Sequence, residues 1–150
     1  MAGILGNDSS LTSKAQELAN SVVGETPQKD NESTIQILLH DFHLRGIPPK
    51  AGIMGAMQEL QNGLKMYRKD NTIMAIKKLS PVVAQMHFFT IDPELKFDAL
   101  VAEWVNKLRQ AGGKVIYDTV ADPHIIRALQ RAGAQLQQSD VPKFKLKALI

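Results

Sequence analysis

The stretch TIDPELKFDALVAEWVNKLRQAGG, residues 90–113, is the clearest helix that the sequence predicts. Asp92 is a suitable N-cap, Pro93 suits the first helical position, and the glycine pair 112–113 is a typical C-terminal stop. Glu94 lies near the positive end of the helix dipole. Of the two apolar stripes along this helix, the bulkier one is expected to be buried: Phe97, Leu100, Val101, Trp104 and Leu108. This helix favours a mainly α fold.

Four earlier segments also show apolar residues at helical spacing. They are 9–23, 34–45, 49–61 and 72–89. The last is expected to kink or restart at Ser80-Pro81, and Asn62-Gly63 leaves the end of the third segment open. The polar stretch ETPQKDNE, residues 25–32, contains a proline and predicts a linker.

Strand-like segments appear only towards the C-terminus. KVIYDTV, residues 114–120, is short and rich in β-branched and aromatic residues. Asp122-Pro123 then repeats the helix start found at Asp92-Pro93. In the tail KFKLKALI, residues 143–150, lysines alternate with apolar side chains, as in an edge strand. The partner of this strand is either segment 115–120 or a neighbouring subunit, and the sequence does not choose between them.

The predicted fold is therefore a mainly α, compact multi-helix bundle with a short C-terminal β element at about 114–120 and 143–149. A chain of 150 residues is long enough for one real core. Four parts are expected along it: an N-terminal helical arm (1–24), a polar linker (25–33), a helical core domain (34–140) and a C-terminal strand-like arm (141–150).

Composition excludes several classes of protein. The chain has no cysteine, which removes disulfides, thiolate nucleophiles and cysteine-based zinc sites. No apolar run approaches the roughly 18 residues of a membrane helix, and no signal peptide is recognisable. We expect a protein without a membrane span, located in the cytoplasm or within a particle assembled inside the cell.

Few residues point to catalysis. His40, Asp41 and His43 lie within one helical turn, but a metal site usually needs three or four ligands. Gly52 and Gly55 match the spacing of a loop that clamps nucleic acid, although close packing of a helix explains them better. No nucleophile elbow, paired-carboxylate spacing or dinucleotide fingerprint is present. We therefore expect no enzyme, no cofactor and no bound metal.

The leading hypothesis is a non-enzymatic structural or assembly protein, a small helical subunit of a virion, connector or secretion-machine type. Its terminal arms would hold it to further copies of itself or to other subunits. The expected interface residues are Leu11, Leu18, Val22, Phe144, Leu146 and Ile150.

The alternative is a nucleic-acid-binding accessory protein. The net charge of +3 is small, but basic residues gather between positions 65 and 78 around one tyrosine. Lys65, Arg68 and Lys69 share a face if the helix continues past Asn62-Gly63, and Lys77 and Lys78 follow one turn signal later. The members of this basic cluster are Lys65, Tyr67, Arg68, Lys69, Lys77 and Lys78.

Overall fold

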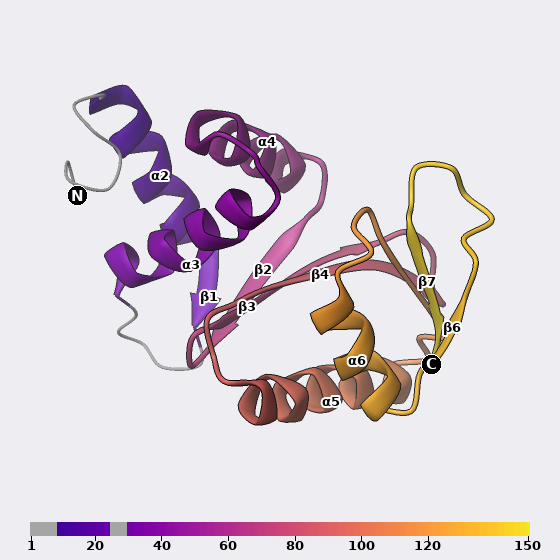
Figure 1. Ribbon diagram of the computed structural model, residues 1–150. Coiled ribbons are helices and arrows are strands. Elements are labelled where there is room, and N and C mark those ends of the chain that lie inside the picture. The colour runs from indigo at the N-terminus through magenta and orange to yellow at the C-terminus, as the bar shows by residue number, and fades with distance from the viewer. Residues whose placement is uncertain (1–8, 25–29) are drawn as a thin grey trace. The chain divides into compact units, whose positions relative to one another are not determined.

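A computed structural model of the chain, shown in Figure 1, describes residues 9–24 and 30–150. The predicted arm 1–24 and linker 25–33 lie partly outside these residues. Within them the helices and strands are, in chain order, α2 (Ser9–Ser21), β1 (Val22–Gly24), α3 (Asn31–Leu44), α4 (Pro49–Gln61), β2 (Lys65–Lys69), β3 (Thr72–Lys78), β4 (Val83–Thr90), α5 (Glu94–Gln110), β5 (Val115–Asp118), α6 (Pro123–Arg131), β6 (Gln135–Gln137) and β7 (Leu146–Leu149).

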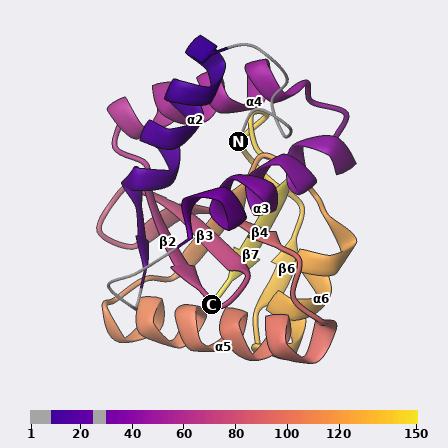
Figure 2. The same cartoon turned by 90° about the vertical axis from the view of Figure 1, so that its left-hand side faces the viewer.

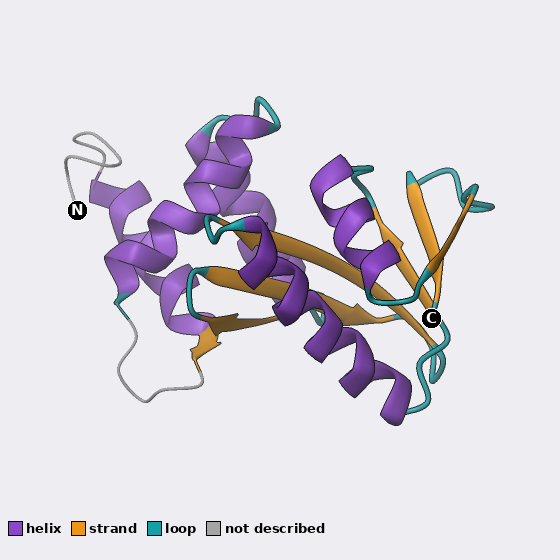
Figure 3. Cartoon of the chain, turned by 60° about the horizontal axis from the view of Figure 1, so that its bottom comes forward, coloured by secondary structure: helices purple, strands orange, loops and turns teal. Residues whose placement is uncertain are grey.

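The strands form one mixed sheet of seven strands in the order β1-β2-β3-β4-β5-β7-β6. β1 runs parallel to β2 and β4 runs parallel to β5, whereas β7 is antiparallel to both β5 and β6. The prediction of a mainly α bundle is therefore wrong. Residues 72–89, expected to be helical, form most of two neighbouring strands, as Figure 3 shows by colour.

The chain divides into two compact units. The first takes the chain through Ala75, together with Phe89–Ile91, and the second contains Ile76–Phe88 and Asp92–Ile150. This division differs from the predicted arrangement of a core domain with two arms. No described helix has both the length and the apolar character needed to span a membrane.

In the first unit, α2, α3 and α4 pack against one another (Figure 2). Their shared core includes Leu18, Val22 and Ile53, each 1% exposed or less, and Phe42, which meets Phe89 edge-on with ring centroids 6.2 Å apart. α3 begins at the N-cap Asp30, whose side chain accepts hydrogen bonds from two backbone amides of the first turn. Residues 9–24 are thus part of a core and not a free arm.

Arg68 on β2 connects the sheet of the first unit to the start of α3. Its guanidinium donates to the hydroxyls of Thr34 (2.8 Å) and Ser33 (3.0 Å) and to the carbonyl oxygens of Asp30 (3.2 Å) and Asp70 (2.7 Å). A planar group with several donors in a fixed fork suits such a junction.

In the second unit the C-terminal strand is an inner strand. β7 lies between β5 and β6, with Leu149 opposite both Val115 and Gln135. Arg109 of α5 donates to the carbonyl oxygen of Ile150 (2.8 Å) and, from another nitrogen, to that of Ala132 (2.9 Å). The tail therefore pairs within its own chain.

The six predicted interface residues are also largely covered by their own chain. Five of them, Leu11, Leu18, Val22, Phe144 and Leu146, are buried in this chain, and Ile150 is half-buried beside Arg109. Side chains already enclosed by their own chain leave little surface for a neighbouring subunit.

Candidate active site

In the second unit, the parallel pairing of β4 with β5 covers only the first part of β4. β4 and β5 are in register from Val83 opposite Val115 to Gln85 opposite Tyr117, and β5 ends at Asp118 while β4 runs on. Each of these strands is followed by a helix. Ligands of sheets with parallel strands bind beyond the carboxyl ends of such strands, so the end of the β4–β5 pairing is the place to look for a site.

Successive side chains of β4 lie on opposite faces of the sheet, and only one face is covered by α5. Phe88 packs against α5, with its ring 5.8 Å from Phe97 and 6.0 Å from Trp104, centroid to centroid. Successive side chains of a strand point to opposite faces, so Gln85 and His87 point away from α5.

His87 and Asp118 form a largely buried polar pair where the pairing of β4 and β5 ends. The Nδ1 atom of His87 lies 2.8 Å from the Oδ2 atom of Asp118, and their side chains are 11% and 1% exposed. The other carboxylate oxygen of Asp118 accepts from the backbone N–H of Val120 at 3.2 Å. A carboxylate only accepts hydrogen bonds, so Nδ1 of His87 carries the hydrogen and Nε2 carries the basic lone pair.

Gln85 adds a second unusual feature to the same face of β4. Within the described residues its Oε1 atom is buried and has no hydrogen-bond partner. Buried polar atoms are nearly always paired, so an orphan of this kind calls for a donor from outside the chain. Gln85 precedes His87 by one full strand period, which places the two side chains on one face.

A second polar cluster holds β5 in place. The ring of Tyr117 stacks on Phe144 with centroids 5.0 Å apart, and its hydroxyl donates to Asp140 at 2.6 Å. This hydrogen bond raises the pKa of Tyr117, and the bonds from Tyr117 and Lys147 lower the pKa of Asp140. Because Asp118 follows Tyr117 directly, the cluster also fixes the carboxylate that orients His87.

The structure does not assemble a site from the other predicted histidine cluster. His40 and His43 are exposed on α3, and the buried Asp41 forms an ion pair with Arg45 at 2.7 Å. Among residues 9–24 and 30–150, no group of three or more potential ligands could hold a metal ion.

The predicted basic cluster does not lie on a helix. Lys65, Tyr67, Arg68 and Lys69 belong to β2, and Lys77 and Lys78 belong to β3. Alternation along a strand sends neighbouring side chains to opposite faces, so Lys65, Arg68 and Lys69 do not share the helical face that was expected for them. Arg68 is already engaged in tying β2 to α3.

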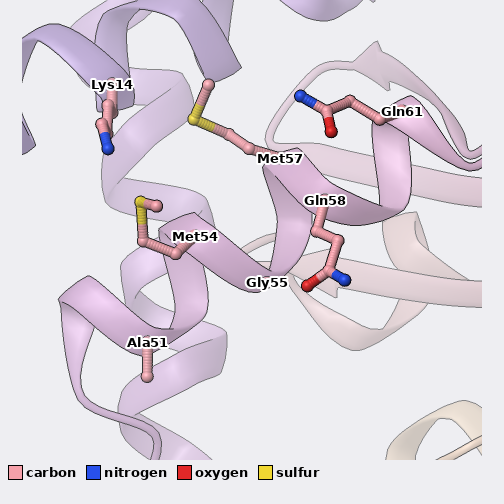
Figure 4. Close-up of a pocket in the computed structure, with 7 residues that line it drawn as sticks. All are labelled: Lys14, Ala51, Met54, Gly55, Met57, Gln58 and Gln61. Carbon is pink, nitrogen blue, oxygen red and sulfur yellow. The ribbon is translucent and has the colours of Figure 1, made fainter.

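A hollow in the first unit lies between α2 and α4 (Figure 4). Its volume is about 490 Å³, and Lys14 of α2 faces Met54 and Met57 of α4 across it. Neither His87 nor Asp118 lines this hollow.

Sequence reasoning missed the His87–Asp118 pair because the two residues are 31 positions apart. Each has a weak local signal: a histidine inside an apolar run, and an aspartate at the end of a predicted strand. Neither signal predicts that the two residues are in contact.

Comparisons with known proteins give folds and no family. No protein-family model matches the chain, and no curated protein matches it. Among solved structures, an N-acetyltransferase of Campylobacter jejuni, PseH, solved with acetyl coenzyme A, has a TM-score of 0.47 and 7% identity, covering 83% of this chain and 92% of that one. The GNAT domain of S. lividans PAT has a TM-score of 0.47 and 10% identity, covering 95% of this chain and 86% of that one.

The predictions of a non-enzymatic role and of a virion-type assembly subunit are corrected by the fold. Both predictions depended on a helical bundle with free terminal arms, and the described residues form neither.

Proposed function

We propose that the chain is an enzyme that transfers an acyl group from a thioester to an amine, with His87 as general base. The observation that carries the proposal is the 2.8 Å hydrogen bond between the partly buried His87 and the buried Asp118, at the point where the parallel pairing of β4 and β5 ends. The reaction to test first comes from the names of the two similar structures. The support comes from the geometry of this chain.

The chemistry assigns each residue a role. An amine nitrogen attacks the thioester carbonyl, a C–N bond forms, and the C–S bond breaks. His87 takes the proton from the nitrogen at Nε2 and returns it to the leaving thiolate, so the products are an amide and a free thiol. Asp118 positions the imidazole and stabilises its charged form, as the carboxylate of a catalytic triad does. The sequence has no cysteine, so the transfer passes through no thioester of the protein.

The absence of cysteine also allows the released thiol to be measured without a background from the protein. A thiol-reactive dye added to the full chain detects only thiol released from the donor. Donors would be acetyl thioesters, and acceptors would include a peptide α-amine, a lysine peptide and a polyamine. Mass spectrometry of the acceptor confirms the amide.

Two variants test the roles of the pair. His87→Gln should lower kcat/KM by about 10²–10⁴-fold, the usual contribution of a general base. Asp118→Asn should weaken the rise of kcat/KM with pH. An amide in place of the carboxylate can hold His87 in the tautomer whose hydrogen is on Nε2, which is not a base. His43→Gln, at an exposed histidine of α3, is the matched control and should retain full activity. Thiol release that is unaffected by His87→Gln in a folded protein would refute the proposal.

A further inference from the structure

We infer that the acyl donor of this chain is recognised through its thioester end and carries no diphosphate bound at the start of α5. This inference rests on the proposed function and names the donor class of that same site. Its basis is the chemistry of the two helix starts that follow β4 and β5.

Diphosphates bind at helix starts for two reasons. Free backbone N–H groups point at the phosphate oxygens, and the positive end of the helix dipole favours negative charge. Glycine in the preceding loop lets the backbone approach closely. A site for coenzyme A, whose nucleotide end carries a diphosphate, would be expected to show some of these features beyond the end of the β4–β5 pairing.

The start of α5 shows the opposite. Pro93 has no N–H, and the segment 90–93 contains no glycine. The carboxylate of Asp92, 2% exposed, lies just before the helix, with Nζ of Lys96 4.0 Å away. Glu94 places a second carboxylate in the first turn. The chain therefore supplies its own negative charge where a phosphate would have to bind.

The cations near this helix start are already engaged. Glu94 lies 2.9 Å from Arg131 and 3.4 Å from Arg127, and Arg131 also binds Asp98. The hydrogen bond from Arg131 lowers the pKa of Glu94, which keeps this carboxylate ionised. The other oxygen of Asp98 is buried without a hydrogen-bond partner among the described residues. An incoming diphosphate would have to displace carboxylates from both arginines.

The start of α6 also carries a carboxylate and a proline. Pro123 again has no N–H, and Asp122 accepts the hydrogen bond of the His124 N–H at 2.8 Å. In the preceding loop the N–H of Val120 is used by Asp118. Two Asp-Pro helix starts thus place carboxylates beside the first helical turn on the edge that holds the His87–Asp118 pair.

The test compares donors on the full chain. Acetyl coenzyme A and S-acetyl-N-acetylcysteamine carry the same acetyl thioester, and only the first carries the diphosphate. The inference predicts kcat/KM values within about threefold of each other. A preference of more than about tenfold for acetyl coenzyme A, which corresponds to about 1.4 kcal/mol of recognition, would overturn it.

A titration with ADP decides the inference independently of activity. Amide signals of residues 92 and 94–98, followed by NMR, should not shift as ADP is raised to millimolar concentration. Saturable shifts there would overturn the inference. The double variant Glu94→Gln, Asp98→Asn frees Arg127 and Arg131 and should gain ADP binding, whereas Glu103→Gln on the same helix should not.

The two tests separate the two ideas. If neither thioester is used, the proposed function is wrong, and the ADP titration still decides the inference. If acetyl coenzyme A is used with strong preference, the proposed function stands and the inference is wrong.

Discussion

A pair of glycines on α4 provides the sharpest test of the packing in the first unit. A Cβ atom added at Gly52 would lie 2.4 Å from Cδ2 of Phe42, whereas one added at Gly55 would meet no atom within 4 Å. Both glycines are inside the same helix, so Gly→Ala gains the same helix propensity at each, about 1 kcal/mol. The difference between the two variants therefore isolates the contact with Phe42.

The geometry sets the size of the effect. Ordinary contact begins at 3.4 Å, so the Phe42 ring would have to retreat by about 1.0 Å (3.4 − 2.4). Phe42 is 3% exposed and lies against Phe89, so it has little room to move. Overpacking of this kind costs about 1–3 kcal/mol. Gly55→Ala should raise the free energy of unfolding by about 1 kcal/mol, and Gly52→Ala should lie about 1–3 kcal/mol below it.

Urea unfolding followed by circular dichroism at about 222 nm measures both variants against the parent chain. If Gly52→Ala is as stable as Gly55→Ala, the Phe42 ring does not fill the space beside α4 and the reasoning fails.

Three further predictions concern polar contacts and the tail. Asp140→Asn should make stability less sensitive to acid. The hydrogen bond from Tyr117 lowers the pKa of Asp140, so this carboxylate stabilises the parent chain above its ordinary pKa of 3.8, and the stabilisation is lost as pH falls through the folded-state pKa. The melting temperatures of the two chains should therefore differ at neutral pH and converge in acid. Arg68→Lys should cost about 1–3 kcal/mol in urea unfolding because several hydrogen bonds are lost, whereas Lys65→Gln, exposed on the same strand, should change stability by less than about 0.5 kcal/mol. Deleting residues 146–150 should abolish the near-ultraviolet circular dichroism of the second unit, since an inner strand is removed; a native spectrum would show that β7 is dispensable.

The wrong fold prediction has a specific physical source in residues 70–90. Thr72 to Ala75 are buried in succession, and fully covered strands lose the alternation by which strands are recognised. The turn before β3 contains Asp70, with φ of 53°, and Ser80 caps the turn before β4. Aspartate and serine bond to nearby backbone in turns and at helix starts alike, so the sequence signals for a hairpin and for a helix N-cap coincide.

The candidate site could be predicted only in part. The histidine and the aspartate are visible in the sequence, and KVIYDTV was expected to be a strand that carries Asp118. Their contact depends on β4 being a strand and on its parallel pairing with β5, both of which the helical prediction for residues 72–89 excluded.

The sequence alone determined the local features of this protein. Asp122-Pro123 starts α6 as expected, with the carboxylate capping the helix. Four of the five side chains expected to be buried along α5 are buried, Phe97, Leu100, Val101 and Trp104, whereas Leu108 is half-buried and Val105, outside the predicted stripe, is buried. Capping and helical periodicity act between residues a few positions apart, so a single segment is enough to show them. Only the tertiary structure decided that residues 72–90 form two strands, that the tail is an inner strand, and that His87 meets Asp118. These outcomes depend on which surfaces cover a segment from outside, and no local pattern contains that information.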